Sequence, residues 1–292
     1  DRRDGLAWSL AADATSERIG RVNGMFEQNV RPDGVVDLLR TTASDEDGRM
    51  RRLNLTPRLE WTLADGDTVT LASFFNVNRF RNRIFSPVTT VIGAPPPVPE
   101  LVTRMHADAE DLRTDLSWTR GLASSATLEA KLGLWGENAD NVQRRQGRDS
   151  AGVAATDGSV DAGWRDRAVN STGKYMRKLE NGHSLALGWD GGVGWRDETR
   201  YEQDAIRVFP PGLALDETFS ARVTRLALYA QDEWSVTPRL SVYLGARWEG
   251  IRTRTSGNTF DTGRSRSSVW SPVLQTLWKI PDTKGDQVRF AV

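Results

Sequence analysis

The sequence offers few side chains that could carry out acid–base, nucleophilic or metal-assisted chemistry. It holds two histidines, His106 and His183, and no cysteine. The first histidine is predicted to lie in a loop and the second beside a tight turn, each without neighbouring metal ligands. The chain shows no serine nucleophile motif and no phosphate-binding loop. We therefore expect a protein that is not an enzyme and that binds no metal or cofactor.

Two further short motifs match known sites only in part. The glycines at positions 188, 191, 192 and 194 do not fit a dinucleotide fingerprint. In a strand, Gly188, Gly192 and Gly194 would share one face, where they either leave room for another molecule or mark a bend. Residues 45–48, Asp-Glu-Asp-Gly, resemble part of a calcium loop but lack its remaining ligands. We predict a solvated loop tip there.

Composition narrows the class of protein. Basic and acidic residues both number 39, so the formal net charge is zero and no nucleic-acid partner is expected. Mean hydropathy is -0.51, and no stretch approaches the roughly 18 apolar residues that a spanning helix needs. A membrane β-barrel remains open, because its strands alternate polar and apolar side chains. The first four residues carry no signal-peptide core, so a secreted protein would be represented by its mature chain or an internal piece.

Alternation with a period of two residues recurs along the chain. Between positions 53 and 63 every second residue is apolar, whereas the residues between them are polar. This pattern predicts a strand with one apolar and one polar face, and a turn follows it at residues 64–67. Similar hairpins are predicted around Gly121–Ser124, Glu180–Gly182, Val236–Pro238 and Pro281–Gly285. We count about thirteen strands. The pattern is weaker before Arg51, where Leu6–Leu10 and Arg21–Phe26 are predicted as short strands and residues 35–39 are a further candidate.

Short turns alternate with long polar connections, which are predicted at residues 79–107, 138–162 and 199–219. Transmembrane barrels show this asymmetry, and a strand of eleven residues matches the span of a tilted strand across a bilayer. Four tryptophans lie a few residues before short turns: Trp61, Trp118, Trp234 and Trp278. Trp248 follows Leu240 by eight residues, roughly 20 Å of a tilted strand, close to the height of an apolar band between aromatic girdles. Packing in a soluble core is the alternative explanation for these tryptophans.

One stretch resembles a known family. Residues 226–234, LALYAQDEW, are followed by the turn exit Thr237–Leu240 and by the strand Leu244–Glu249. Together they resemble a barrel hairpin of TonB-dependent receptors. A second pattern, Asn54–Trp61 with its Asp-Gly-Asp turn, recurs loosely from Ser271 to Trp278 and is typical of outer-membrane barrels in general.

The resemblance implies an all-β fold, a transmembrane antiparallel up-and-down β-barrel of 22 strands with a plug in its lumen. We expect residues 1–292 to be a fragment of that barrel domain, without the plug and the C-terminal strands. The resemblance further implies a receptor in the outer membrane of a Gram-negative bacterium. It would be surrounded by lipid, driven by TonB through the plug, and would import a bulky, scarce solute. A ferric siderophore is the preferred solute, with cobalamin or an oligosaccharide as alternatives.

Charged residues on the polar faces are predicted to line the lumen: Arg58, Glu60, Arg113, Glu129, Lys131, Arg247 and Glu249. They would either pair across strands and stiffen the wall or hold the plug. Substrate contacts are expected from outer loops, with these aromatic candidates: Phe85, Trp164, Tyr201 and Phe209. Rival functions are a passive porin or channel, an adhesin or secretion pore, and a soluble β-rich carbohydrate-binding protein or hydrolase.

Overall fold

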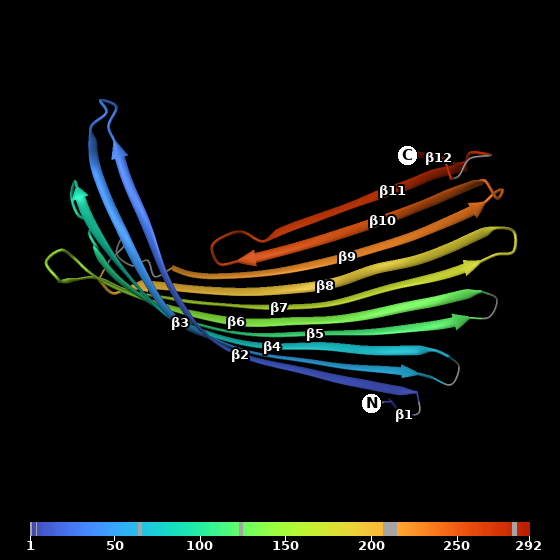
Figure 1. Ribbon diagram of the computed structural model, residues 1–292, viewed down its shortest axis with the longest axis horizontal. Helices are drawn as coiled ribbons and strands as arrows, with labels where there is room; N and C mark the ends of the chain where they lie inside the picture. The colour runs from blue at the N-terminus through green and yellow to red at the C-terminus, as the bar shows by residue number, and fades with distance from the viewer. Residues whose placement is uncertain (1, 4, 64–65, 123–124, 207–214, 282–284) are drawn as a thin grey trace.

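The computed structural model describes residues 2–3, 5–63, 66–122, 125–206, 215–281 and 285–292. These residues form one antiparallel sheet of twelve strands, in which each strand pairs with its neighbours along the chain (Figure 1). The strands are β1 Arg2–Arg3, β2 Leu6–Val30, β3 Val36–Thr62, β4 Thr68–Ile92, β5 Glu100–Leu122, β6 Ala126–Arg148, β7 Ala154–Lys178, β8 His183–Asp204, β9 Leu215–Ser235, β10 Leu240–Gly257, β11 Gly263–Lys279 and β12 Gln287–Ala291. Among the described residues no helix is long and apolar enough to cross a lipid bilayer.

The predicted all-β, up-and-down arrangement is confirmed, although the strands are longer and number twelve where we predicted about thirteen. The two short strands predicted near the N-terminus are parts of one strand, β2, which pairs with β3 over its whole length. Residues 11–20 between them lack alternation between apolar and polar residues, but strand pairing depends on backbone hydrogen bonds, which do not require that alternation.

The long polar connections predicted from the sequence are wrong in extent. Most of residues 79–107 belong to β4 and β5, and only Gly93–Pro99 separates these strands. The connection predicted at 138–162 shrinks to 149–153, and β8 continues to Asp204 before β9 begins at Leu215. The ladders therefore continue well past the end of the apolar alternation, which was the only strand signal that the sequence offered.

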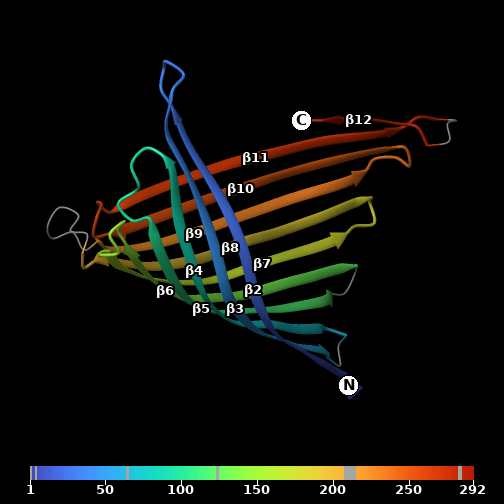
Figure 2. The same ribbon diagram turned by 60° about the vertical axis from the view of Figure 1, so that its left-hand side comes forward.

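The sheet is curled and open. Figure 2 shows β2, β3 and β4 passing in front of β7 to β10, so that the first and last strands form two walls joined by the middle strands. The order runs from β1 to β12, and within the described part of the chain the two end strands do not pair with each other. This shape is part of a barrel wall.

Register keeps one kind of side chain on each face of the sheet. Leu59 lies opposite Leu71, which lies opposite Leu116, which in turn lies opposite Leu132. We call the face that carries these leucines the apolar face. The other, which carries Arg58 and its cross-strand neighbours, is the polar face.

The apolar face has no packed core behind it. Among the described residues the buried hydrophobic side chains are alanines only. Large apolar side chains are exposed instead, with Leu228 50% exposed, Leu244 51% and Trp270 70%. Contiguous apolar surface of this kind marks contact with a membrane or another molecule.

Tryptophans mark the two borders of the apolar face. Trp61, Trp234 and Trp278 each lie one residue before the end of their strands, β3, β9 and β11, as the sequence predicts. Trp118 of β5 also lies near this edge, where its indole N–H donates to the carboxylate of Asp67 at 3.0 Å. Further along β10 and β11, Trp248 lies opposite Trp270.

Candidate functional site

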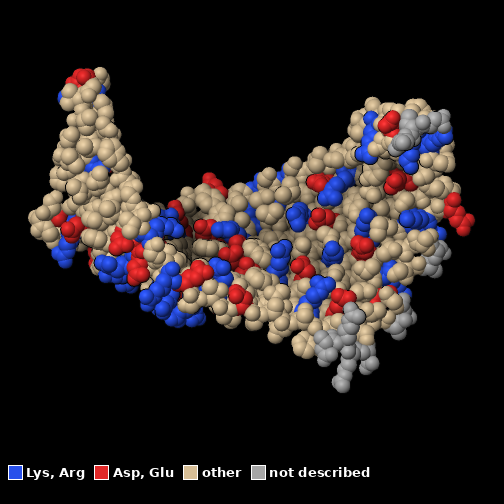
Figure 3. Space-filling model, viewed as in Figure 1, with Lys and Arg blue, Asp and Glu red and all other residues tan. Residues whose placement is uncertain are grey.

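The seven charged residues predicted to face the lumen all lie on the polar face. Some pair along a strand, where residues i and i+2 share a face. Arg58 lies 3.4 Å from Glu60, and Arg247 contacts Glu249 in the same way. No ion pair of Glu129 or Lys131 is present in the described part of the chain. Figure 3 shows basic and acidic side chains intermixed over the middle of the sheet.

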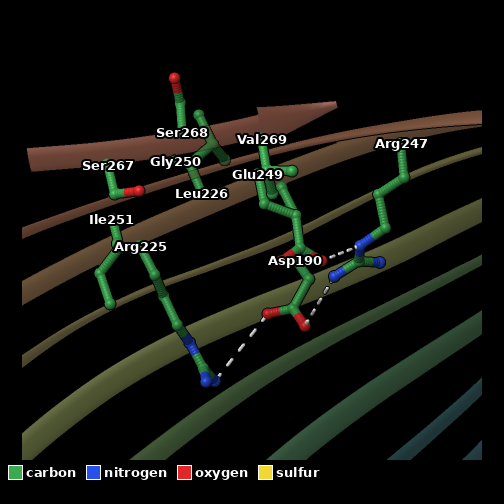
Figure 4. A pocket seen from close by; sticks show the side chains of 11 residues that line it. Asp190, Arg225, Leu226, Arg247, Glu249, Gly250, Ile251, Ser267, Ser268 and Val269 are labelled. Carbon is green, nitrogen blue, oxygen red and sulfur yellow. Dashed lines mark hydrogen bonds and ion pairs between the residues drawn. The ribbon is translucent and has the colours of Figure 1, made fainter. Parts of the chain in front are cut away.

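Asp190 of β8 links three strands on the polar face. Its carboxylate lies 3.9 Å from the guanidinium of Arg225 in β9 and 4.0 Å from that of Arg247 in β10 (Figure 4). Both distances are too long for hydrogen bonds, and the Oδ1 atom of Asp190 is buried without a hydrogen-bond partner among the described residues. The carboxylate is therefore held by charge while it keeps a free acceptor.

An aromatic ring occupies the space above Gly188. Tyr229 of β9 lies opposite Gly188, and a Cβ atom at that position would fall inside the tyrosine ring. Arg247 in turn lies over the same ring, with Cζ 5.9 Å from its centroid, within the range of a cation–π interaction. Of the two alternatives for Gly188, room for another molecule is wrong, because the ring of Tyr229 fills the space beside the glycine and supports Arg247. Gly192 also leaves no room for another molecule, because a Cβ there would already meet the backbone oxygen of Val169 at 3.0 Å.

These residues border two shallow pockets that share Arg247. One, of about 240 Å³, is lined by Asp190, Arg225, Arg247 and Glu249 with β10 and β11 residues around them. The other, of about 380 Å³, includes Lys174, Tyr229 and Tyr243. The combination of guanidinium groups, carboxylates and phenol hydroxyls suits recognition of a polar solute that carries both donors and acceptors.

A second polar network lies farther along the strands, beyond the apolar band. Glu202 of β8 accepts hydrogen bonds from Arg200 at 2.8 Å and from Arg145 of β6 at 2.5 Å. These bonds, that of Arg200 first, hold the pKa of Glu202 below its ordinary value. Arg196 similarly joins Asp166 of β7, at 3.1 Å. The network ties the outer ends of β6, β7 and β8 together.

Three of the four aromatic residues predicted in outer loops belong instead to strands. Phe85 lies in β4 and Tyr201 in β8, both on the face continuous with the apolar face. Trp164 of β7 lies on the polar face, where its indole N–H donates to Glu137 at 3.1 Å. Phe209 lies outside the described residues. For Phe85, Trp164 and Tyr201 the loop placement was wrong, because polar strand extensions cannot be distinguished from loops by hydropathy. The structure does not gather these three residues into one site.

The isolated motifs of the sequence also lie in strands. His106 is in β5 rather than in a loop, whereas His183 begins β8 beside its turn, as predicted. The Asp-Glu-Asp-Gly motif lies inside β3 and is not a loop tip, and its Glu46 accepts a hydrogen bond from Asn82 at 2.7 Å. Among the described residues no three acidic, histidine or cysteine side chains are placed to share a metal ion.

Sequence reasoning missed Asp190, Arg225 and Tyr229. The missed signal was the phase of the alternation, which places Asp190 on the same face as Gly188. A glycine at one position of a strand pair favours an aromatic residue opposite it.

A family description that matches nearly the whole chain shows which protein family it belongs to. The description TonB dependent receptor-like, beta-barrel, matches residues 13–291. The chain belongs to this family. TonB-dependent receptors are transport receptors of the outer membranes of Gram-negative bacteria, and the barrel-like fold predicted from the sequence is that of the family.

Solved structures with similar folds include the siderophore receptor PiuA from Acinetobacter baumannii, with a TM-score of 0.57 and 12% identity. The match covers 99% of this chain and 49% of PiuA, so the chain spans about half the length of that receptor. At this identity the likeness supports the fold alone.

Two further structures are less similar. The ferripyoverdine receptor of Pseudomonas aeruginosa has a TM-score of 0.49 at 11% identity, with 98% of this chain and 41% of that one covered. The outer membrane protease OmpT from Escherichia coli has a TM-score of 0.30 at 11% identity, over 97% and 96% of the two chains. No curated protein matches the chain.

Proposed function

We propose that residues 1–292 form one stretch of barrel wall in an outer-membrane receptor that imports a bulky, scarce solute, preferentially a ferric siderophore. Cobalamin and an oligosaccharide are the alternative solutes. The polar face lines the lumen, where it meets a plug that lies outside this stretch and on which TonB acts. Lipid surrounds the apolar face.

The observation that carries this proposal is the arrangement of charge on the polar face. Asp190 is held between Arg225 and Arg247, with a buried carboxylate oxygen that lacks a hydrogen-bond partner among the described residues. The Asp190 side chain is nevertheless 36% exposed, so its carboxylate can accept a hydrogen bond from whatever fills the lumen, be it plug or solute. Membership of the family supports active transport. PiuA, a structure with a similar fold, is a siderophore receptor, which supports an iron chelate as the first solute to test.

The test is uptake by a strain that lacks its own copy of the full-length gene. Uptake of hydroxamate and catecholate iron chelates, cobalamin and a labelled oligosaccharide is measured with the wild-type gene, with Asp190→Asn, and in a second strain without TonB. We expect one solute class to be imported, import to stop without TonB, and Asp190→Asn to reduce it about tenfold. Asp115→Asn is the matched control, since Asp115 lies on the same face and outside both pockets.

A passive porin or channel is the second candidate, because the polar face would also suit a water-filled pore. Uptake that continues unchanged without TonB would favour the channel. A soluble carbohydrate-binding protein would migrate identically on gels with and without heating in detergent, whereas a barrel changes its mobility.

A further inference from the structure

Five arginines gather on the outward side of β9, β10 and β11. They lie on the face continuous with the apolar face, as the register with Trp248 and Trp270 shows. All five are exposed. They are Arg222, Arg252, Arg254, Arg264 and Arg266, and we call them the arginine patch.

Register brings the patch together in two adjacent rows. Arg222, Arg254 and Arg264 are directly opposite one another across three strands. Arg252 lies opposite Arg266 in the next row. Directly opposed residues have Cβ atoms only about 5 Å apart, so like charges in such rows destabilise the sheet unless anions neutralise them.

The patch lacks neutralising partners among the described residues. None of its five guanidinium groups forms an ion pair there, whereas Asp190, Asp166 and Glu202 each hold arginines on the polar face. Asp197 of β8 lies on the same face, one row away from Arg222, and accepts a hydrogen bond from Ser220 at 2.8 Å.

The distance of the arginine patch from the tryptophan border, measured along the barrel axis, indicates which molecules it faces. Arg252 follows Trp248 by four residues, which is roughly 10 Å along the barrel axis for a strand tilted near 40°. Interfacial tryptophans mark the boundary of the hydrocarbon region, and headgroups extend for several ångströms beyond it. Trp195 completes the row, with Arg222 Cζ 5.5 Å from its ring centroid.

We propose that the arginine patch binds the phosphate groups of anionic lipid headgroups in the leaflet that surrounds the outer part of the barrel. Guanidinium groups match phosphate oxygens with paired hydrogen bonds, and long arginine side chains reach along the interface. The proposal depends on the membrane location of the barrel but on no particular solute. Solute uptake can therefore fail while lipid binding is observed, and lipid binding can fail while solute uptake is observed.

The opposite wall carries outward arginines as well, but their surroundings differ. Arg79 of β4 lies opposite Asp108, and Arg83 lies opposite Asp47. One row of that wall, Arg18, Arg49 and Arg81, contains no acid either, but the rows on its two sides contain Asp108 and Asp47. The two adjacent rows of the arginine patch contain no acid among the described residues.

The test compares lipid binding by the full-length protein in neutral detergent, with bound lipids counted by native mass spectrometry. Phosphatidylglycerol, phosphatidylcholine and inorganic phosphate are supplied separately and in competition. We expect a preference for phosphatidylglycerol over phosphatidylcholine that weakens at least tenfold in the triple variant Arg252→Gln, Arg254→Gln, Arg264→Gln. The matched control removes three charges from the polar face, with Arg113→Gln, Arg196→Gln and Arg200→Gln, and should keep the preference.

Equal binding of the two lipids, or equal losses in the two triple variants, would overturn the proposal. So would displacement of phosphatidylglycerol by inorganic phosphate at the same concentration, because the patch would then bind free anions. A triple lysine variant guards against misfolding. It keeps the charge and should retain the preference for phosphatidylglycerol, although with weaker binding because lysine lacks the paired donors.

Discussion

Gly188 is the position at which one added methyl group should disturb the polar face most. A Cβ there would overlap the ring of Tyr229, which itself supports Arg247. We expect Gly188→Ala to lower the free energy of unfolding by about 1–3 kcal/mol, the usual cost of overpacking. Denaturant unfolding of the refolded protein in detergent measures it.

The same strand supplies the control. Gly194 lies on the same face of β8, but the nearest atom to an added Cβ is 3.8 Å away. Gly194→Ala should therefore change stability little, and the cost of Gly188→Ala should largely disappear in a Tyr229→Ala background. Similar losses in both glycine variants would mean that strand propensity, rather than the tyrosine contact, sets the requirement for glycine.

His183 and Asp232 form the other local contact with a measurable effect. The Nδ1 atom of His183 lies 2.6 Å from the carboxylate of Asp232, and the imidazole is stacked on Trp234 with centroids 5.0 Å apart. Replacing Asp232 with asparagine should cost about 1 kcal/mol in stability at neutral pH, the typical value of one hydrogen bond. A loss in Asp232→Asn that persists undiminished in a His183→Ala background would contradict a contribution from this pair.

At the scale of strands, the outer ends of β6, β7 and β8 should depend on pH. Hydrogen bonds from Arg200 and then Arg145 lower the pKa of Glu202 in the folded protein. The stabilisation is then complete above the ordinary glutamate pKa of 4.5 and is lost as pH falls through the lowered value. Native-state hydrogen exchange, corrected for intrinsic rates, should show these ends opening more often below about pH 4.5.

Glu202→Gln should remove most of this pH dependence by weakening the ends at every pH. Glu198→Gln is the comparison, because Glu198 binds one arginine, at 3.2 Å, and is more exposed. If both variants keep the wild-type pH profile, the pairing of Glu202 does not hold the strand ends together.

The sequence predicted the strand segments that have one apolar face. It did not predict the strand segments in which both faces are polar. Between Leu53 and Leu63 alternation fixes both the strand and its faces, and register confirms them through Leu59 and Leu71. In the stretches 79–107 and 138–162 no apolar face is needed, so polar strands read as loops. Asp190 was missed for a related reason, since its site depends on three strands whose relative register no single strand encodes.

At the scale of the whole molecule, the two faces of the sheet require two different surroundings. The apolar face exposes leucines and tryptophans across all its walls, and a single curled sheet has no second layer to cover them. Ion pairs concentrate on the other face, where they stiffen the wall or contact what fills the barrel. The proposed membrane location meets both requirements at once.

Residues 1–292 contain no cysteine, so single labels on adjacent residues can test this division once any cysteine elsewhere in the full-length protein has been replaced. Leu244 and Tyr243 are neighbours in β10 but lie on opposite faces, with Leu244 opposite Leu274. In the full-length protein reconstituted into vesicles, a spin label at Leu244→Cys should be relaxed by oxygen dissolved in the bilayer. A label at Tyr243→Cys should respond instead to a water-soluble nickel chelate, provided that the polar face is hydrated. The same contrast is expected between Leu59→Cys and Arg58→Cys in β3, on the other wall. The reverse pattern at both pairs would place the polar face toward lipid, a costly location for Arg247 and Arg58, and would remove the basis for a lumen lined by these residues.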